Sequence, residues 1–269
     1  MKKVIALLTD FGYSDYYTGV LKGVIKKINP DIDVLDISHG IPSFDLLPAA
    51  FVIDKNFRFF PRSTVFLVVV DPGVGSDRKI LLITHAGYSF IAPDNGVLTP
   101  ILNQPKKIVR TLKGDRFFLI PGKIREKQVS TFEARDKMAP VAAYLSSGVD
   151  PEELSIITSK FVLLKGYSPI PEVNGIKGGI VYSDKFGNLV SNISGNLLFT
   201  ALNKSGLSRF KVMIHGNEIN DFYQTYMDGS RKPFILIGSH GNIEIAVNKG
   251  SATQLLDISV GQPLKIRFY

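Results

Sequence analysis

The sequence predicts an α/β protein, with an N-terminal Rossmann-like α/β domain around a mostly parallel sheet and a smaller C-terminal β-barrel or β-sandwich domain. Two short apolar runs, Val4–Leu8 and Val65–Val70, each lead into an aspartate and a glycine turn. Such runs are typical of buried parallel strands. Strand and helix patterns alternate through residues 1–160, whereas short β-type runs separated by turns follow residue 165. The change of pattern predicts two domains.

The N-terminal elements follow from hydrophobic spacing. Apolar residues from Tyr17 to Ile28 recur at helical intervals, and Pro30 ends that pattern. Ser43 is the predicted cap of a second helix, whose inward face runs from Leu46 to Ile53. Strands are predicted at residues 34–37, 65–70, 80–84 and 90–92, and a later helix contains Met138, Val141, Ala142 and Leu145.

A stretch with two prolines, residues 165–171, predicts a linker between the domains. We therefore assign residues 1–165 to the α/β domain, 166–175 to the linker and 176–269 to the β-rich domain. Helical spacing is weak in the last segment, and strands are predicted at residues 179–182, 210–214, 234–237, 243–247 and 264–268.

Composition excludes several classes of protein. The net charge of +8 divides into +5 over residues 1–165 and +3 over residues 166–269, with no basic run longer than two residues. This spread is typical of a solvated surface, so no nucleic-acid partner is expected. No apolar run is long enough to span a membrane, and the first one ends at Asp10 as a strand would. Because the chain has no cysteine, we expect no disulfides and a cytoplasmic location.

The glycine turn after the second run does not fit a phosphate-binding loop. Gly73 and Gly75 begin a dinucleotide motif, but Arg78 stands at the third glycine position, and no lysine follows as in a P-loop. What remains is a strand-end acid, Asp71, with an arginine seven positions later. Either this pair is a surface ion pair on a tight turn, or it belongs to a ligand site at the sheet edge.

Asp10 also allows two interpretations. Either it belongs to a ligand site at the sheet edge, or Asp10-Phe11-Gly12 only turns the chain and caps the next helix. The four histidines, His39, His85, His215 and His240, lack metal-ligand spacing, so no metal is expected.

Six sequence blocks occur in order along the chain: Thr9–Gly12, Asp36–Ile41, Asp71–Arg78, Pro93–Gly96, Phe186–Leu189 and Glu244–Asn248. Together they resemble one family, the S-adenosylmethionine hydroxide adenosyltransferases, which are relatives of fluorinase and chlorinase. The resemblance covers essentially the whole chain. It implies a homotrimer with sites between subunits and no cofactor. It also implies attack of water-derived hydroxide on C5′ of S-adenosylmethionine, giving adenosine and methionine.

By this resemblance Asp71 and Arg78 match the catalytic aspartate and arginine. Glu133 stands where hydroxide-using members carry the histidine of a Phe-His-Gly-Arg-Asp block. Two hypotheses remain open. Glu133 could accept a proton from water, with Arg78 offsetting repulsion between the acids. Alternatively, the protein binds adenosine or S-adenosylmethionine with weak or no turnover.

Halide transfer is not expected, because fluorinase and chlorinase carry tyrosine at the position of Asp71, and a fixed carboxylate repels halide. The resemblance places the ribose diol on Asp10. It implies that Phe186 and Tyr226 stack on adenine, and that Asn188 and the backbone around Val247 and Lys249 bind the purine edge. The remaining substrate-binding residues it implies are Phe44 near the sugar, Asp15, Tyr17, Asp184 and Ser239 toward methionine, and Glu244, which has no assigned partner.

Overall fold

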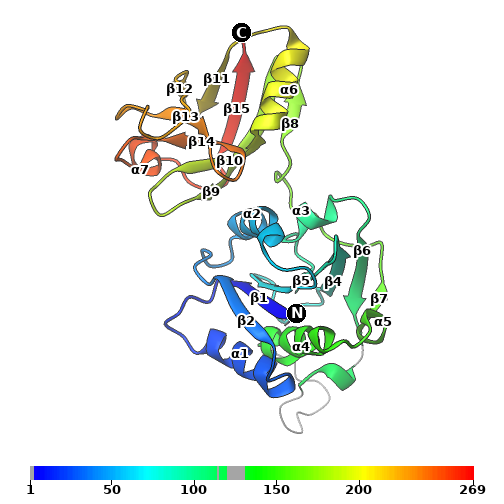
Figure 1. Cartoon of the computed structure of the whole chain (residues 1–269). Helices are drawn as coiled ribbons and strands as arrows, with labels where there is room; N and C mark the ends of the chain where they lie inside the picture. Colours follow the sequence, from blue (N-terminus) through cyan, green and yellow to red (C-terminus); the bar gives the residue numbers. More distant parts are fainter. Residues whose placement is uncertain (1–2, 114, 120–130) are drawn as a thin grey trace. The chain divides into compact units, whose positions relative to one another are not determined.

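The computed structural model describes residues 3–113, 115–119 and 131–269. The chain is mixed α/β and divides into two compact units, residues 1–164 and 165–269, each built on its own sheet (Figure 1). Within the described ranges, no helix has the length and apolar character needed to cross a membrane.

The first unit contains a seven-stranded sheet in the order β2-β1-β3-β5-β4-β6-β7. The predicted strands and helices all form, with small shifts at their ends, and two strands (β6 and β7) and two short helices (α3 and α5) are additional. The strands are β1 (Val4–Thr9), β2 (Asp33–Ser38), β3 (Val65–Val69), β4 (Ile80–His85), β5 (Tyr88–Pro93), β6 (Ile108–Leu112) and β7 (Ser155–Ile157). The helices are α1 (Tyr17–Ile28), α2 (Leu46–Asn56), α3 (Thr99–Leu102), α4 (Ala139–Ser147) and α5 (Pro151–Leu154), with 3-10 turns at Phe57–Phe59 and Asp115–Phe117 and a π-helical turn at Ala134–Met138.

This sheet is half parallel, which corrects the prediction of a mostly parallel one. Strands β2, β1, β3 and β5 pair in parallel, whereas β4, β6 and β7 add three antiparallel pairings. The change begins at a two-residue turn between His85 and Tyr88, where Ala86 and Gly87 both have positive φ. Such a turn joins antiparallel neighbours, so β4 and β5 form a hairpin.

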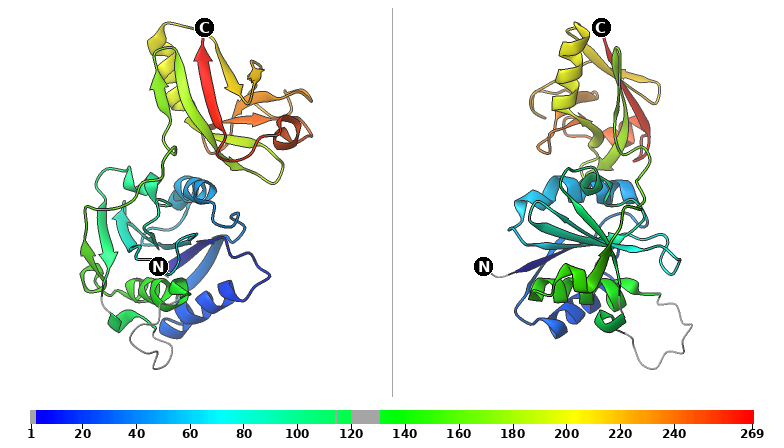
Figure 2. Two further views of the ribbon diagram at one scale, coloured as in Figure 1. Left: turned by 180° about the vertical axis from the view of Figure 1, so that it is seen from behind. Right: turned by 90° about the vertical axis from the view of Figure 1, so that its right-hand side faces the viewer.

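Helices cover both faces of the first sheet, with α1 and α4 on one face and α2 and α3 on the other (Figure 2). Side chains alternate accordingly along β3. Val65 and Leu67 join the apolar cluster under α1 and α4. Phe66 points the other way and stacks on Phe90, 5.1 Å between ring centroids. Burial on both faces explains why the strand reads as a continuous apolar run.

The N-cap of helix α2 lies two residues after the predicted one. Asp45, not Ser43, is the N-cap, and its side chain accepts a hydrogen bond from the backbone of Leu47. Both residue types favour this position, so composition alone does not choose between them.

The second unit contains a continuous sheet in the order β12-β11-β15-β9-β10-β14-β13, with β8 paired to β9. Its long strand β9 pairs with β15 through its first half and with β10 through its second half, which curves the sheet around a shared core. The elements are β8 (Ile170–Glu172), β9 (Gly175–Ser183), β10 (Leu189–Ser194), α6 (Gly195–Ser205), β11 (Phe210–Ile214), β12 (Asn217–Ile219), β13 (Phe234–Ile237), β14 (Asn242–Ala246), α7 (Ala252–Leu256) and β15 (Pro263–Phe268).

Helix α6 corrects the expectation that this segment lacks clear helices. Ser194 caps it by accepting a hydrogen bond from the backbone of Leu197, and Gly206 ends it in the left-handed conformation. Leu198 and Leu202 pack into the core. The sequence therefore carried both end signals and a helical pair of leucines, within a segment read as β-rich throughout.

The first unit ends in a segment that is tied to the turn after β5. The backbone N–H groups of Val162 and Leu164 donate to the side chains of Asp94 (2.8 Å) and Thr99 (2.7 Å). Asn95, in the same turn, donates to the carbonyl of Val70 at 2.9 Å. This turn therefore binds both the end of the unit and the residue that precedes Asp71.

Candidate functional site

Asp10 and Asp71 follow neighbouring parallel strands and lie at the same edge of the first sheet. Thr9 is in register with Val69, and the N–H of Asp10 points to the carbonyl of Val69 at 3.4 Å. Burial raises the pKa of Asp10, and the charge of Asp71 raises it further, against a hydrogen bond from the backbone of Phe44 (2.9 Å). The negative charge of Asp71 thus disfavours ionisation of Asp10.

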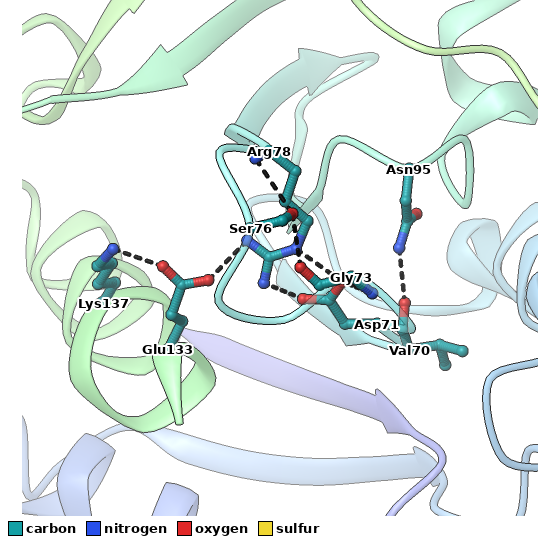
Figure 3. Close-up of polar contacts among 8 residues, drawn as sticks. All are labelled: Val70, Asp71, Gly73, Ser76, Arg78, Asn95, Glu133 and Lys137. Atoms are coloured by element: carbon teal, nitrogen blue, oxygen red, sulfur yellow. Dashed lines mark hydrogen bonds and ion pairs between the residues drawn. The ribbon is translucent and has the colours of Figure 1, made fainter. Parts of the chain in front are cut away.

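Arg78 holds the Asp71 carboxylate from the side (Figure 3). Its Nε donates to Oδ1 of Asp71 at 2.7 Å, and its Nη2 donates to Oδ2. The backbone N–H of Gly73 also donates to Oδ1, at 3.1 Å, so the glycine turn closes on the acid. Both side chains are more than nine-tenths buried, with 9% of Asp71 and 8% of Arg78 exposed. The pair is thus a buried bidentate ion pair and not a surface one.

Glu133 binds the other side of the same guanidinium. Its Oε2 lies 2.6 Å from Nη1 of Arg78, and its Oε1 lies 2.5 Å from Nζ of Lys137, one turn further along the chain. Figure 3 shows Arg78 between the two carboxylates. We call Asp71, Arg78, Glu133 and Lys137 the Arg78 cluster. With two acids and two bases, it carries no net formal charge.

An aromatic contact joins the Asp10 turn to the segment that carries Glu133. Phe11, Tyr17 and Phe132 have ring centroids 5.2–5.9 Å apart in their three pairs. Tyr17 thus lies near the predicted site. Asp15 is exposed on the preceding loop, and the Phe44 ring is 65% exposed beside the backbone group that binds Asp10.

The C-terminal candidates gather in the second unit around a pocket of about 540 Å³, which we call the Tyr226 pocket. Six of the predicted residues line it, and Asn248 and Gly250 are additional. The lining residues are Asp184, Phe186, Asn188, Tyr226, Val247, Asn248, Lys249 and Gly250. The Phe186 and Tyr226 rings are 65% and 43% exposed, so they are available to a planar ligand.

Asp184 organises one wall of this pocket. Its Oδ1 accepts the backbone N–H groups of Phe186 (2.9 Å) and Asn188 (3.0 Å), and its Oδ2 accepts from the Asn188 side chain (2.9 Å). Gly187 has a φ of +83°, and a Cβ there would lie 2.0 Å from Oγ of Ser251. The turn therefore requires glycine and presents Phe186 and Asn188 in fixed positions.

The structure supplies the missing partners of Glu244. Its Oε1 accepts from the Tyr226 hydroxyl at 2.6 Å, and its Oε2 lies 3.2 Å from Nε2 of His240. Burial and the bond to Glu244 raise the pKa of Tyr226. Glu244 is thus buried beneath the pocket wall, whereas Ser239 lies exposed in the turn after β13 and is not among the lining residues.

Sequence reasoning missed Lys137 and His240. Lys137 had a usable signal, because an acid followed four residues later by a lysine often pairs on a helix. His240 stands four residues before Glu244, but it lies in the turn between β13 and β14, whereas Glu244 lies on β14. The spacing rule for helices therefore does not connect the two. Among the described residues, no group of three or more histidine, aspartate or glutamate side chains is arranged to hold a metal.

Both units match one sequence family. Residues 5–155 match the N-terminal domain of SAM hydroxide adenosyltransferases, and residues 178–265 match their C-terminal domain, where SAM is S-adenosylmethionine. The chain belongs to the SAM hydroxide adenosyltransferase family. The family resemblance drawn from the sequence blocks is thereby confirmed.

Similar proteins in this family carry two activity names. The (R)-S-adenosyl-L-methionine hydrolases of Thermus thermophilus and Methanocaldococcus jannaschii are each 30% identical to the chain. The alignments cover 97% and 98% of this chain, and 98% and 95% of those proteins. A fluorinase from an Actinoplanes species is 23% identical, over 96% of this chain and 95% of its own.

Solved structures show the same fold. An uncharacterized conserved protein from Thermotoga maritima superposes with a TM-score of 0.84 at 33% identity, covering 98% of this chain and 99% of its own. A conserved hypothetical protein from Thermus thermophilus gives a TM-score of 0.74 at 26% identity, with complete coverage of both chains.

Proposed function

We propose that the protein hydrolyses S-adenosyl-L-methionine to adenosine and L-methionine. The oxygen of water bonds to C5′ of the ribose while the C5′–S bond breaks, and the sulfonium takes the bonding pair to leave as a neutral thioether. One proton of the water is lost. Because the leaving group is neutral, the reaction needs a proton acceptor but no general acid.

The observation that carries this proposal is the buried, arginine-held Asp71 beside Asp10 in a member of this family. A carboxylate has about four acceptor positions. Arg78 and the Gly73 N–H occupy three of those on Asp71, and one position on Oδ2 is left by the described residues. We assign that position to the attacking water, with Asp71 accepting its proton and Arg78 fixing the carboxylate.

Different residues bind the ribose and the adenine of the substrate. Asp10 accepts hydrogen bonds from the ribose diol, and the Tyr226 pocket receives adenine between Phe186 and Tyr226. Asn188 has one amide hydrogen on Asp184 and offers its remaining groups to the purine edge. Alignment of water and carbon in this way supplies up to about 7–11 kcal/mol of the barrier.

The relatives' names carry an R configuration at sulfur, and we propose the same epimer as substrate here. We also propose a homotrimer with sites at subunit interfaces, as the family resemblance implies, and no cofactor. Light scattering of the purified protein tests the assembly. Separate assays of the two sulfonium epimers test the stereochemistry, and equal rates on both would contradict it.

Product analysis tests the activity. The wild-type protein is expected to release adenosine and methionine in equal amounts from S-adenosylmethionine. Asp71→Asn is expected to lose about 10²–10⁴-fold in kcat, the usual contribution of a general base. Asp54→Asn, which removes a carboxylate paired with Lys55, is the matched control. If the wild type forms no adenosine above the uncatalysed background but is stabilised by the ligand, the protein only binds it.

A further inference from the structure

Glu133 is held on both of its oxygens by cations. Arg78 Nη1 and Lys137 Nζ lie 2.6 Å and 2.5 Å from Oε2 and Oε1, and the Glu133 side chain is only 7% exposed. The neighbouring Arg135 pairs with Asp136, with Nε 2.6 Å from Oδ1. Ionised Glu133 is therefore paired with two bases at once.

The position of Glu133 also separates it from the ribose side of the cluster. Arg78 lies between the two carboxylates (Figure 3), and it is Asp71 whose charge acts on Asp10. A water placed against a ribose held by Asp10 is thus served by Asp71. Glu133 faces the opposite side of the guanidinium, toward Lys137.

The proton affinity of Glu133 also argues against a role as the base. Burial alone would raise the pKa of Glu133, but hydrogen bonds and charges from Lys137 and Arg78 outweigh burial and lower that pKa below its usual range. A carboxylate with a lowered pKa is a weaker proton acceptor at neutral pH.

We propose that Glu133 is a positioning residue that, with Lys137 as its counterion, fixes Arg78 against Asp71, and that it does not take the proton from water. This rests on the proposed hydrolysis. It replaces the hypothesis that Glu133 acts as the base in place of the family histidine. Lys137 then has a defined task, because without it the cluster would carry an excess negative charge beside Asp71.

An activity-independent titration provides the first test. Glutamate labelled with ¹³C at the side-chain carboxyl reports the protonation of Glu133 by NMR, and Glu133→Gln identifies the signal. In Lys137→Met we expect this carboxyl to titrate at a higher pH than in the wild type. Lys55→Met is the matched control, because Lys55 is a partly exposed lysine paired with Asp54. An unchanged titration in Lys137→Met would overturn the proposal.

Kinetics provides the second test. Glu133→Gln keeps a polar oxygen beside Arg78, so we expect kcat within about tenfold of wild type, whereas loss of a general base costs about 10²–10⁴-fold. Lys137→Met should lower kcat about tenfold, a typical coupling between contacting residues, and move the acid limb of the rate profile to higher pH. Lys137→Arg should restore both.

The double variant tests whether the effects of Glu133 and Lys137 on kcat depend on each other. Glu133→Gln with Lys137→Met lacks the unpaired anion, so it should be faster than Lys137→Met alone. A loss in Glu133→Gln as large as in Asp71→Asn would overturn the positioning role. An inactive wild type would instead defeat the proposed hydrolysis, and the NMR titration would still decide whether Lys137 and Arg78 hold Glu133.

Discussion

The Arg78 cluster and the Tyr226 pocket solve different physical problems. In the cluster, the side chains of Asp71, Arg78 and Glu133 are more than nine-tenths buried and are held by short ion pairs. In the pocket, aromatic rings are 43% and 65% exposed, and the buried charge of Glu244 lies behind the wall. Fixed charges suit a reaction that needs an oriented proton acceptor. Exposed rings on a rigid turn suit recognition of a flat base.

This contrast predicts its largest effect at Arg78. Arg78→Ala leaves Asp71 and Glu133 as buried carboxylates without their shared cation. Breaking such a pair costs about 3–5 kcal/mol of folding free energy, and losing a preorganised donor costs about 10²–10³-fold in kcat. Denaturant unfolding and adenosine release measure the two losses.

The control for Arg78 is an exposed arginine. Arg116 pairs with Glu153, and both side chains are more than half exposed, so Arg116→Ala should change stability by about 0–1 kcal/mol. Equal costs at the two arginines would mean that burial of the Arg78 cluster has no energetic consequence.

The pocket should respond in KM and hardly in kcat. Tyr226→Ala removes one stacking surface, which is worth about 1–3 kcal/mol per base, so KM should rise about 10–100-fold. Met227→Ala changes the neighbouring residue, which is 75% exposed and is not among the lining residues, and should leave KM unchanged. A fall in kcat without a rise in KM would place Tyr226 in the chemical step.

Substitution of Asp10 should have opposite effects on substrate binding and on stability. Its folded-state pKa is raised, so the folded protein binds this proton more readily than the unfolded chain, and ionised Asp10 costs stability. That cost grows as pH rises through the unfolded pKa and is complete above the folded pKa. Asp10→Asn should therefore be more stable than wild type at neutral pH, with the gain disappearing in acid.

The same variant lacks the charged acceptor for the ribose hydroxyls. A hydrogen bond to a charged group contributes about 1.5–3 kcal/mol, so KM should rise about 10–100-fold. Thermal unfolding at pH 7 and pH 3, with Asp31→Asn as an exposed control, measures the stability change. If Asp10→Asn were less stable than wild type at neutral pH, ionised Asp10 would not destabilise the folded protein as we infer.

The contrast also explains what the sequence could predict. Asp10 and Asp71 were found because parallel strands end at a common edge, and that rule depends only on the apolar runs before them. The mixed sheet was not predicted, since a two-residue hairpin at Ala86-Gly87 reverses the strand direction within a uniform apolar pattern. Contacts such as Tyr226 with Glu244 join residues 18 positions apart through tertiary packing, and no local spacing encodes them.

Helix α6 was missed for a different reason. Its cap and leucine pair were readable, but the surrounding strands weighted the whole segment toward β structure. Glu133 was located through family resemblance. Its counterion Lys137 carried the signal of an acid–lysine pair four residues apart, and the π-helical turn Ala134–Met138 brings the two side chains together.

The bonds from Asp94 and Thr99 to Val162 and Leu164 set a practical limit on dissecting the chain. The same turn holds the carbonyl of Val70 through Asn95, one residue before the acid that we assign to proton transfer. A fragment meant to carry the first unit alone should thus extend through Leu164. Ending it a few residues earlier would remove the hydrogen bonds of Val162 and Leu164 to this turn, and the turn would hold Val70, next to Asp71, less firmly.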